Sequence, residues 1–184
     1  MINILIPAMG KSNFYKDSYF PKSLYEIKGK TMLEYVVDNY SMLDDSRYIF
    51  AFDEDECMRF HVDSSAKMLA EKCVVLKLSN STKGALCTSL MAVEYIQDAD
   101  PLIIANCDQV ISENYSKIID SFEANGGDAG VIVFDSIHPR WSYTRIDGDE
   151  VVETAEKKPL SKNAIAGFYY FRNGNSFVES AKRV

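Results

Sequence analysis

The chain has 184 residues, of which 47% are hydrophobic and 26% are charged, and its formal net charge is −7. A chain of this length can form one domain that buries roughly 70% of its unfolded surface, and we expect a single domain over residues 1–184. The acidic balance argues against nucleic acid or an anionic membrane as partner, although a local basic cluster can still bind phosphate groups.

The four cysteines are scattered through the chain and form no C-x-x-C pair. The sequence has no signal-peptide pattern and no long apolar run. These features predict reduced thiols in a cytoplasmic protein and argue against a zinc site.

Short apolar runs predict strands at residues 3–6, 48–52, 73–76, 102–105 and 129–134. Apolar residues at three- and four-residue spacing predict helices between them, at 31–40, 54–70, 83–96 and 114–123. This alternation predicts a Rossmann-like α/β fold, with a mostly parallel sheet covered by helices on both faces. After about residue 135 the alternation stops, and strands at 141–146, 151–154 and 164–171 predict a small antiparallel extension that carries substrate contacts.

Two helix starts have the pattern of a capping box, Thr31 with Glu34 and Asp53 with Glu56. The acidic run 53–56 is therefore interpreted as a solvated helix start rather than a metal site, because negative charge complements the helix dipole there.

Asp108 follows the buried strand predicted at 102–105, inside the stretch PLIIANCDQV. Ligands of open α/β sheets bind at the carboxyl ends of the strands. One carboxylate at such a place suits Mg²⁺, which completes its shell with water and phosphate oxygens. The alternative is that Asp108 only turns the chain before the next helix.

The loop after the first strand offers groups that suit a phosphate. Gly10 lets backbone amides approach an anion closely, and Lys11 and Lys22 bring ammonium groups. Two lysines in a polar loop are usually just solvated, but a loop of this length beside a candidate metal carboxylate is often functional.

Gly84 lies at the start of a predicted helix, where glycine costs about 1 kcal/mol relative to alanine. Either close approach of a nucleobase or ribose, or a tight contact between helix and strand, would explain it.

Six blocks of sequence occur in one order over most of the chain: IPAMG, FPKSLYEIKGKTMLEYVV, TKGALCTSLMA, IIANCDQ, WSYTRI and AEKKPLSKNAIAGFYYF. They resemble the sugar-1-phosphate nucleotidyltransferases, also called nucleotide-sugar pyrophosphorylases. The resemblance implies a GT-A-like nucleotidyltransferase fold and a Mg²⁺-dependent reaction that couples a nucleoside triphosphate to a sugar 1-phosphate. It further implies that pyrophosphate is released and that the activated sugar supplies capsule or surface polysaccharide biosynthesis.

The same resemblance implies roles for individual residues. Gly10 falls in the loop that cradles phosphates, Lys22 matches the lysine that stabilises the reacting phosphates, and Asp108 matches the metal-binding aspartate. Gly84 matches the glycine before the helix that contacts the nucleoside. Glu156 and Lys157 match the pair that holds the sugar phosphate, and Tyr143 lies in the segment that usually approaches the sugar.

The sequence departs from the family pattern at two places. The glycine-rich loop is shortened, and Asn13 stands about where an arginine that clamps the triphosphate is expected, although Lys11 or Lys16 can restore part of its charge. A second metal-binding aspartate is not in view before Val184, which leaves a missing C-terminal segment or a minimal enzyme as alternatives.

Nucleotidyl transfer is the function that we expect, and two alternatives remain. A GT-A-type glycosyltransferase would normally show two aspartates flanking one residue at the metal site, and residues 106–108 do not. A regulatory protein could keep the nucleotide pocket without catalysis. The sequence leaves the base, the sugar and the oligomeric state open, a homo-oligomer included.

Overall fold

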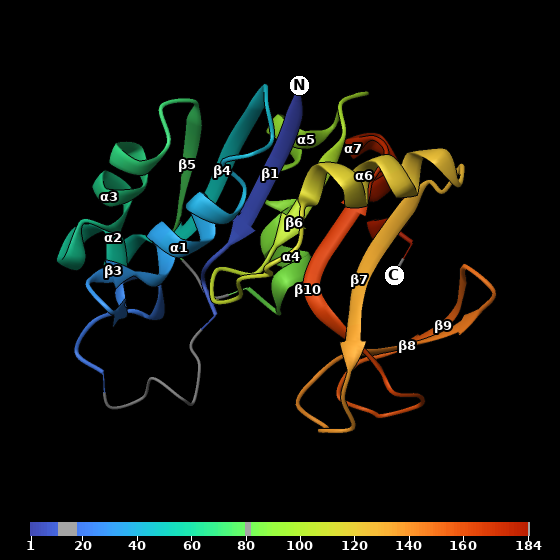
Figure 1. Ribbon diagram of the computed structural model, residues 1–184. Helices are drawn as coiled ribbons and strands as arrows, with labels where there is room; N and C mark the ends of the chain where they lie inside the picture. Colours follow the sequence, from blue (N-terminus) through green and yellow to red (C-terminus); the bar gives the residue numbers. More distant parts are fainter. Residues whose placement is uncertain (11–17, 80–81, 184) are drawn as a thin grey trace.

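The computed structural model describes residues 1–10, 18–79 and 82–183. Its centre is an eight-stranded sheet with the strand order β5-β4-β1-β6-β10-β8-β9, and β7 pairs with β10 (Figure 1). The first four of these strands, β5 (Cys73–Leu78), β4 (Ser46–Asp53), β1 (Ile2–Pro7) and β6 (Leu102–Ala105), are parallel to one another. The predicted parallel sheet is thereby confirmed, and its strand carboxyl ends lie along one edge.

Helices cover both faces of this sheet, as predicted. One face packs against α1 (Met32–Asn39), α2 (Glu54–Phe60), α3 (Val62–Leu69) and α6 (Tyr115–Ala124). The other face packs against α4 (Ala85–Leu90), α5 (Val93–Ile96) and α7 (Gly174–Ala181). Side chains of a strand alternate between these two cores, so that Ile4 and Ile6 of β1 enter the first and Leu5 enters the second.

Two of the predicted helices are interrupted. The helix expected at 54–70 breaks at His61, which adopts a left-handed conformation with φ 54° and separates α2 from α3. The helix expected at 83–96 breaks between α4 and α5, where Thr88 and Ser89 donate side-chain hydrogen bonds to the carbonyls of Gly84 and Ala85. Such bonds from position i to i−4 often bend a helix. The 3.6-residue period does not reveal either interruption.

The segment after residue 135 forms antiparallel strands that extend the central sheet, as predicted, and its last strand lies inside that sheet. β10 (Asn163–Phe171) lies between β6 on one edge and β7 (Ala129–Asp135) on the other. The hairpin of β8 (Tyr143–Asp147) and β9 (Glu150–Ala155) continues from the start of β10 and projects from the body in Figure 1.

Both predicted caps are present. Thr31 Oγ1 accepts a hydrogen bond from the Glu34 amide at 3.2 Å. Asp53 Oδ1 accepts from the amides of Asp55 and Glu56 at 2.9 and 3.2 Å. The acidic run therefore begins helix α2, as interpreted from the sequence.

The four cysteines are free thiols. Within the described ranges, every helix is too short or too polar to cross a bilayer.

A short turn and hairpin precede α1. The 3-10 turn η2 (Lys22–Leu24) is followed by β2 (Glu26–Ile27) and β3 (Lys30–Thr31), joined through Lys28 and Gly29 at φ 51° and 83°. Positive φ at both residues is typical of a tight two-residue hairpin turn.

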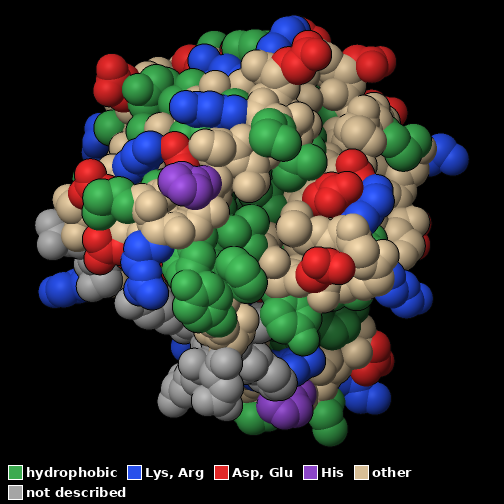
Figure 2. Space-filling view, turned by 90° about the vertical axis from the view of Figure 1, so that its left-hand side faces the viewer, with side chains coloured by type: hydrophobic (Ala, Val, Ile, Leu, Met, Phe, Trp, Pro, Cys, Tyr) green, Lys and Arg blue, Asp and Glu red, His purple; other side chains and the backbone are tan. Residues whose placement is uncertain are grey.

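An exposed aromatic cluster anchors the chain just before η2. The rings of Tyr19, Phe20 and Phe60 meet edge-on, with centroids 5.1 to 5.7 Å apart. Figure 2 looks onto this side of the molecule and shows hydrophobic side chains gathered on its lower half. Because Phe60 belongs to α2, the cluster ties the approach to Lys22 to the body of the fold.

Candidate functional site

A cleft of about 690 Å³ lies at the carboxyl edge of the four parallel strands. Residues at or just after the ends of β1, β4, β5 and β6 all contribute to its walls, together with the start of α4. The lining residues are Pro7, Met9, Gly10, Lys22, Asp53, Ser79, Thr82, Gly84, Ala85, Thr88, Asn106, Cys107 and Asp108. Four of the sequence-predicted site residues, Gly10, Lys22, Gly84 and Asp108, thus meet in one place.

Lys22 and Asp108 form the charged pair of this cleft. Lys22 Nζ lies 3.3 Å from Asp108 Oδ2, and the two side chains are 17% and 28% exposed. The lysine comes from turn η2 and the aspartate from the loop after β6. Both side chains therefore reach the cleft while keeping a path to solvent.

The protonation states around this pair follow from burial and charge. Burial raises the pKa of the Cys107 thiol to about 11, so the thiol is neutral near pH 7. Burial by itself would lower the pKa of Lys22. The interactions of the ammonium group with Cys107 and Asp108 outweigh that effect, so the pKa of Lys22 lies above its ordinary value. Lys22 is therefore a fully charged cation at neutral pH.

Gly10 lies beside the lysine. A Cβ placed on it would come within 4.0 Å of Lys22 Nζ. A glycine here leaves the approach to the ammonium group open, which suits the predicted contact with phosphate. Lys11, with Asn13 and Lys16, lies outside the described residues.

Gly84 is the N-cap of α4, at φ 117° and ψ 178°. This is a region of backbone space that only glycine occupies readily. A Cβ at Gly84 would meet no atom within 4 Å, so the tight helix-to-strand contact considered above is absent among the described residues. The Thr82 and Thr88 hydroxyls hydrogen-bond to each other, and each lies within hydrogen-bond distance of the Gly84 carbonyl, at 3.3 and 3.1 Å.

A bulge in β10 supports the loop that carries Asp108. Gly167 lies in the bulge at φ 63°, and its carbonyl accepts a hydrogen bond from the Asn106 amide at 3.0 Å. A Cβ there would lie 2.3 Å from Asn106 Nδ2 and 1.9 Å from Gln109 Oε1. The side-chain amide of Asn106 donates from Nδ2 to Gln109 Oε1 at 3.3 Å. Sequence reasoning missed all three residues, and the glycine before FYYF is the one signal that could have suggested a bulge.

A second cleft, of about 590 Å³, adjoins the first one and also has Asp108 in its wall. One side is the segment 108–113, which is polar except for Val110 and Ile111. The other side is mostly apolar, with Ile132, Val133, Phe134, Trp141 and Ala166. The Trp141 ring meets Phe134 edge-on at 5.2 Å, and the Arg140 guanidinium lies 4.4 Å from its centroid. Asp108 is thus common to two adjacent clefts of different character.

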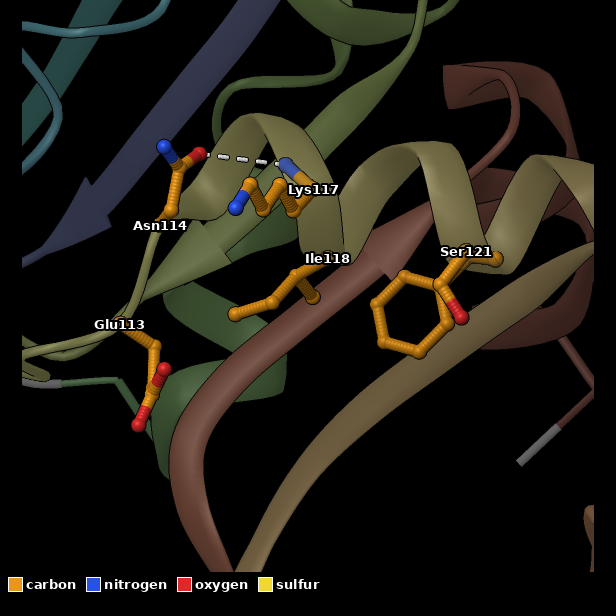
Figure 3. A pocket seen from close by; sticks show the side chains of 6 residues that line it. Glu113, Asn114, Lys117, Ile118 and Ser121 are labelled. Carbon is orange, nitrogen blue, oxygen red and sulfur yellow. Dashed lines mark hydrogen bonds between the residues drawn. The ribbon is translucent and has the colours of Figure 1, made fainter.

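A shallow depression continues from the second cleft along α6. Figure 3 shows the side chains around it, with Glu113 at its near end and Ser121 farther along the helix. The dashed line in that view is the cap of α6, in which Asn114 Oδ1 accepts from the Lys117 amide at 3.2 Å.

The structure does not bring the predicted sugar-phosphate residues into either cleft. Tyr143 is fully buried, and its hydroxyl donates to the His138 carbonyl at 2.8 Å. Glu156 and Lys157 are exposed in the loop between β9 and β10, and their side chains pair with each other at 2.9 Å. Tyr143 is therefore placed as a packing residue of the extension.

The donor set of the site fits Mg²⁺. Among the described residues no three His, Cys, Asp or Glu side chains converge, so the protein offers no complete metal cage. Mg²⁺ does not require one, because it binds through one or two carboxylates and takes its other ligands from water and phosphate. Asp108, partly exposed at the junction of the clefts, is such a carboxylate.

A parallel sheet with a lysine, a carboxylate and glycines at its carboxyl edge is the arrangement of proteins that bind phosphorylated nucleotides. Residues 4–161 match the family model described as the MobA-like NTP transferase domain, and the chain belongs to that family. It is thus a nucleotidyltransferase domain, as the sequence resemblance predicted.

Two solved structures share this fold. One is the nucleoside-diphosphate-sugar pyrophosphorylase from Vibrio cholerae RC9, with a TM-score of 0.78 and 22% identity over 100% of this chain and 78% of that one. The other, in complex with sucrose, is a candidate glucose-1-phosphate thymidylyltransferase from Bacillus anthracis, with a TM-score of 0.81 and 17% identity over 96% and 73%. No curated protein sequence matches the chain. At these identities the two structures establish the fold.

Proposed function

We propose that the protein couples a nucleoside triphosphate to a sugar 1-phosphate, with release of pyrophosphate. The observation that carries the proposal is the place of Asp108, which lies in the walls of both clefts and pairs with Lys22. A reaction between two phosphorylated substrates needs one charged centre that both can reach.

The two clefts suit different halves of such a reaction. The first has glycines and hydroxyl groups, which accommodate a triphosphate and its nucleoside. The second has a polar rim opposite Trp141 and apolar side chains, which suits a ring with hydroxyls on its edge and C–H groups on its face. We assign the triphosphate to the first cleft and the sugar to the second.

The chemistry follows from charge. An oxygen of the sugar phosphate attacks the α-phosphorus, a new P–O bond forms, and the bond to the β-phosphate oxygen breaks as pyrophosphate leaves in line. Negative charge gathers on the α-phosphate, so catalysis depends mainly on positioning and charge neutralisation. Lys22 donates hydrogen bonds to those oxygens, exchanging its bond to Asp108 for them.

Asp108 would hold Mg²⁺ in this scheme, and the ion when bound supplies positive charge to the phosphates. The reaction needs no proton acceptor and no covalent intermediate, because the attacking phosphate oxygen is already ionised. Glu156 and Lys157 remain proposed contacts of the sugar phosphate, on the resemblance alone. On the same basis we propose that the activated sugar serves polysaccharide synthesis.

A panel of common triphosphates with Mg²⁺ tests the proposal, first by thermal shift and then by pyrophosphate release with sugar 1-phosphates. We expect one triphosphate to raise the melting temperature and to yield pyrophosphate together with a nucleotide sugar of the expected mass. Stabilisation without pyrophosphate would favour a regulatory nucleotide-binding protein. Binding of a finished nucleotide sugar in preference to the triphosphate would favour a glycosyltransferase.

A further inference from the structure

We propose that Asn39, at the end of α1, is a positioning residue that holds the Asp108 loop in its reactive place. Its side chain makes three hydrogen bonds, none of them to a residue of its own helix. Asn39 Nδ2 donates to the Ile111 carbonyl at 2.8 Å, and Asn39 Oδ1 accepts from the Ile111 amide at 3.0 Å. The same oxygen accepts from the Tyr115 hydroxyl at 2.9 Å.

The Asn39 side-chain amide bonds both backbone groups of Ile111, as the backbone of a neighbouring β-strand would. Both backbone groups of one residue are satisfied by one side-chain amide, which fixes that residue in position and orientation. Ile111 lies three residues after Asp108, in the segment 108–113 that forms the polar wall of the second cleft. A shift at Ile111 therefore moves the carboxylate and that wall together.

Buried aromatic packing makes the anchor rigid. Tyr40, next to Asn39, has its ring centroid 4.6 Å from that of Tyr115, and Tyr115 lies 5.3 Å from Phe168 of β10. All three side chains are at least 97% buried. The end of α1 is thus joined to the start of α6 and to the strand beside the Gly167 bulge.

The other end of α1 is connected to Lys22. The Met32 amide donates to the Tyr25 carbonyl at 2.9 Å, and the Tyr25 amide donates to the Lys22 carbonyl at 3.2 Å. One helix therefore holds the lysine turn at its start and the aspartate loop at its end. We infer that α1 sets the separation of Lys22 and Asp108, and that Asn39 is its contact with the aspartate side.

The test is Asn39→Ala, with Asn114→Ala as the matched control. Asn114 caps α6 at the other end of the same segment, so its loss also weakens the fold but leaves the bonds to Ile111 intact. Misplacing a reacting group by about 1 Å can cost up to 100-fold in rate, so we expect Asn39→Ala to lower kcat about tenfold or more. The KM for the triphosphate, whose cleft Asn39 does not line, should change little. Asn39→Asp keeps both accepting contacts but replaces the Nδ2 donor with an oxygen that faces the Ile111 carbonyl, so it should not restore the wild-type kcat.

Amide hydrogen exchange in residues 108–113 supplies a second readout that requires no turnover. We expect faster exchange at Ile111 in Asn39→Ala and unchanged exchange in Asn114→Ala. Unchanged exchange, an unchanged kcat, or an equal loss of kcat in both variants would overturn the inference. Because the inference rests on the proposed function, a wild-type protein that releases no pyrophosphate would refute that function, while the exchange experiment would still decide whether Asn39 holds the loop.

Discussion

Lys22 Nζ and Asp108 Oδ2 lie 3.3 Å apart although 86 positions separate the residues in the sequence. The pair forms where the turn before α1 faces the loop after β6, at the junction of the two clefts. Before substrate binds, the Lys22 ammonium and the Asp108 carboxylate neutralise each other. Neither partly buried charge is then left without a counterion.

Replacing Asp108 tests the metal-binding carboxylate. Asp108→Asn should lower Mg²⁺-dependent turnover about 100-fold or more, because a neutral amide is a poor Mg²⁺ ligand. The variant should still fold, since the Asp108 side chain reaches solvent, but its melting temperature should fall because Lys22 loses its counterion. Asp120→Asn, the same substitution at an exposed position of α6, is the control for the change in charge. Near-normal turnover of Asp108→Asn with Mg²⁺ would show that the carboxylate is not the metal ligand.

Replacing Lys22 tests the cation that faces the reacting phosphates. Lys22→Met should lower kcat about 100-fold, because one donor to developing charge is worth ~3 kcal/mol in the transition state. Lys67→Met, at an exposed position of α3, is the matched control. A raised KM with unchanged kcat would instead make Lys22 a ground-state binding residue.

The raised pKa of Lys22 gives the Lys22–Asp108 pair a defined pH dependence. A lysine whose folded pKa exceeds its unfolded value contributes stability at neutral pH and loses it as pH rises through the folded pKa. The ordinary value is 10.5, so this contribution should persist through pH 9 and fade only above 10.5. Urea denaturation of wild type and Lys22→Met between pH 7 and pH 11 measures it. A difference in stability that disappeared already near pH 8 would contradict the raised pKa.

Gly84→Ala tests whether backbone conformation, rather than space, requires glycine at the start of α4. The added methyl group meets open space, but the backbone at φ 117° and ψ 178° should make alanine cost about 1–3 kcal/mol of folding free energy. Gly126→Ala, at φ 70° beyond α6, provides a comparison in the less strained left-handed region, where we expect a smaller loss. Equal stability of Gly84→Ala and wild type would leave contact with the nucleoside as the reason for the glycine.

Tyr143→Phe separates a packing role from a substrate contact. The variant loses the partly buried hydrogen bond to the His138 carbonyl, which should cost about 1 kcal/mol. Tyr48→Phe removes a similar bond, to the Val37 carbonyl, in a strand away from the extension, and should cost about the same. We expect the KM for the sugar phosphate to be the same in both variants. A selective rise of that KM in Tyr143→Phe would restore the role that the sequence resemblance implied.

Local sequence patterns determined the strands, most of the helices and the place of Asp108. An apolar run followed by polar residues marks the end of a buried strand wherever it occurs, and parallel strands bring such ends to one edge. The same reasoning placed Lys22 and Gly10 at that edge, whereas the resemblance to the family assigned Gly84 to the nucleoside. The caps at Thr31 and Asp53 could also be predicted, because a cap depends on residues only three positions apart.

Only the tertiary structure decided how β10 enters the sheet between β6 and β7, and which residues support the site. The contacts of Asn39 with Ile111 and of Gly167 with Asn106 join segments 72 and 61 positions apart. Tyr143 could not be recognised as buried, because a tyrosine in a strand serves equally in a core or at a binding surface. Hydrophobic periodicity predicts which face of its own helix or strand a residue occupies. Strand order and the support of loops depend instead on which distant segments pack together.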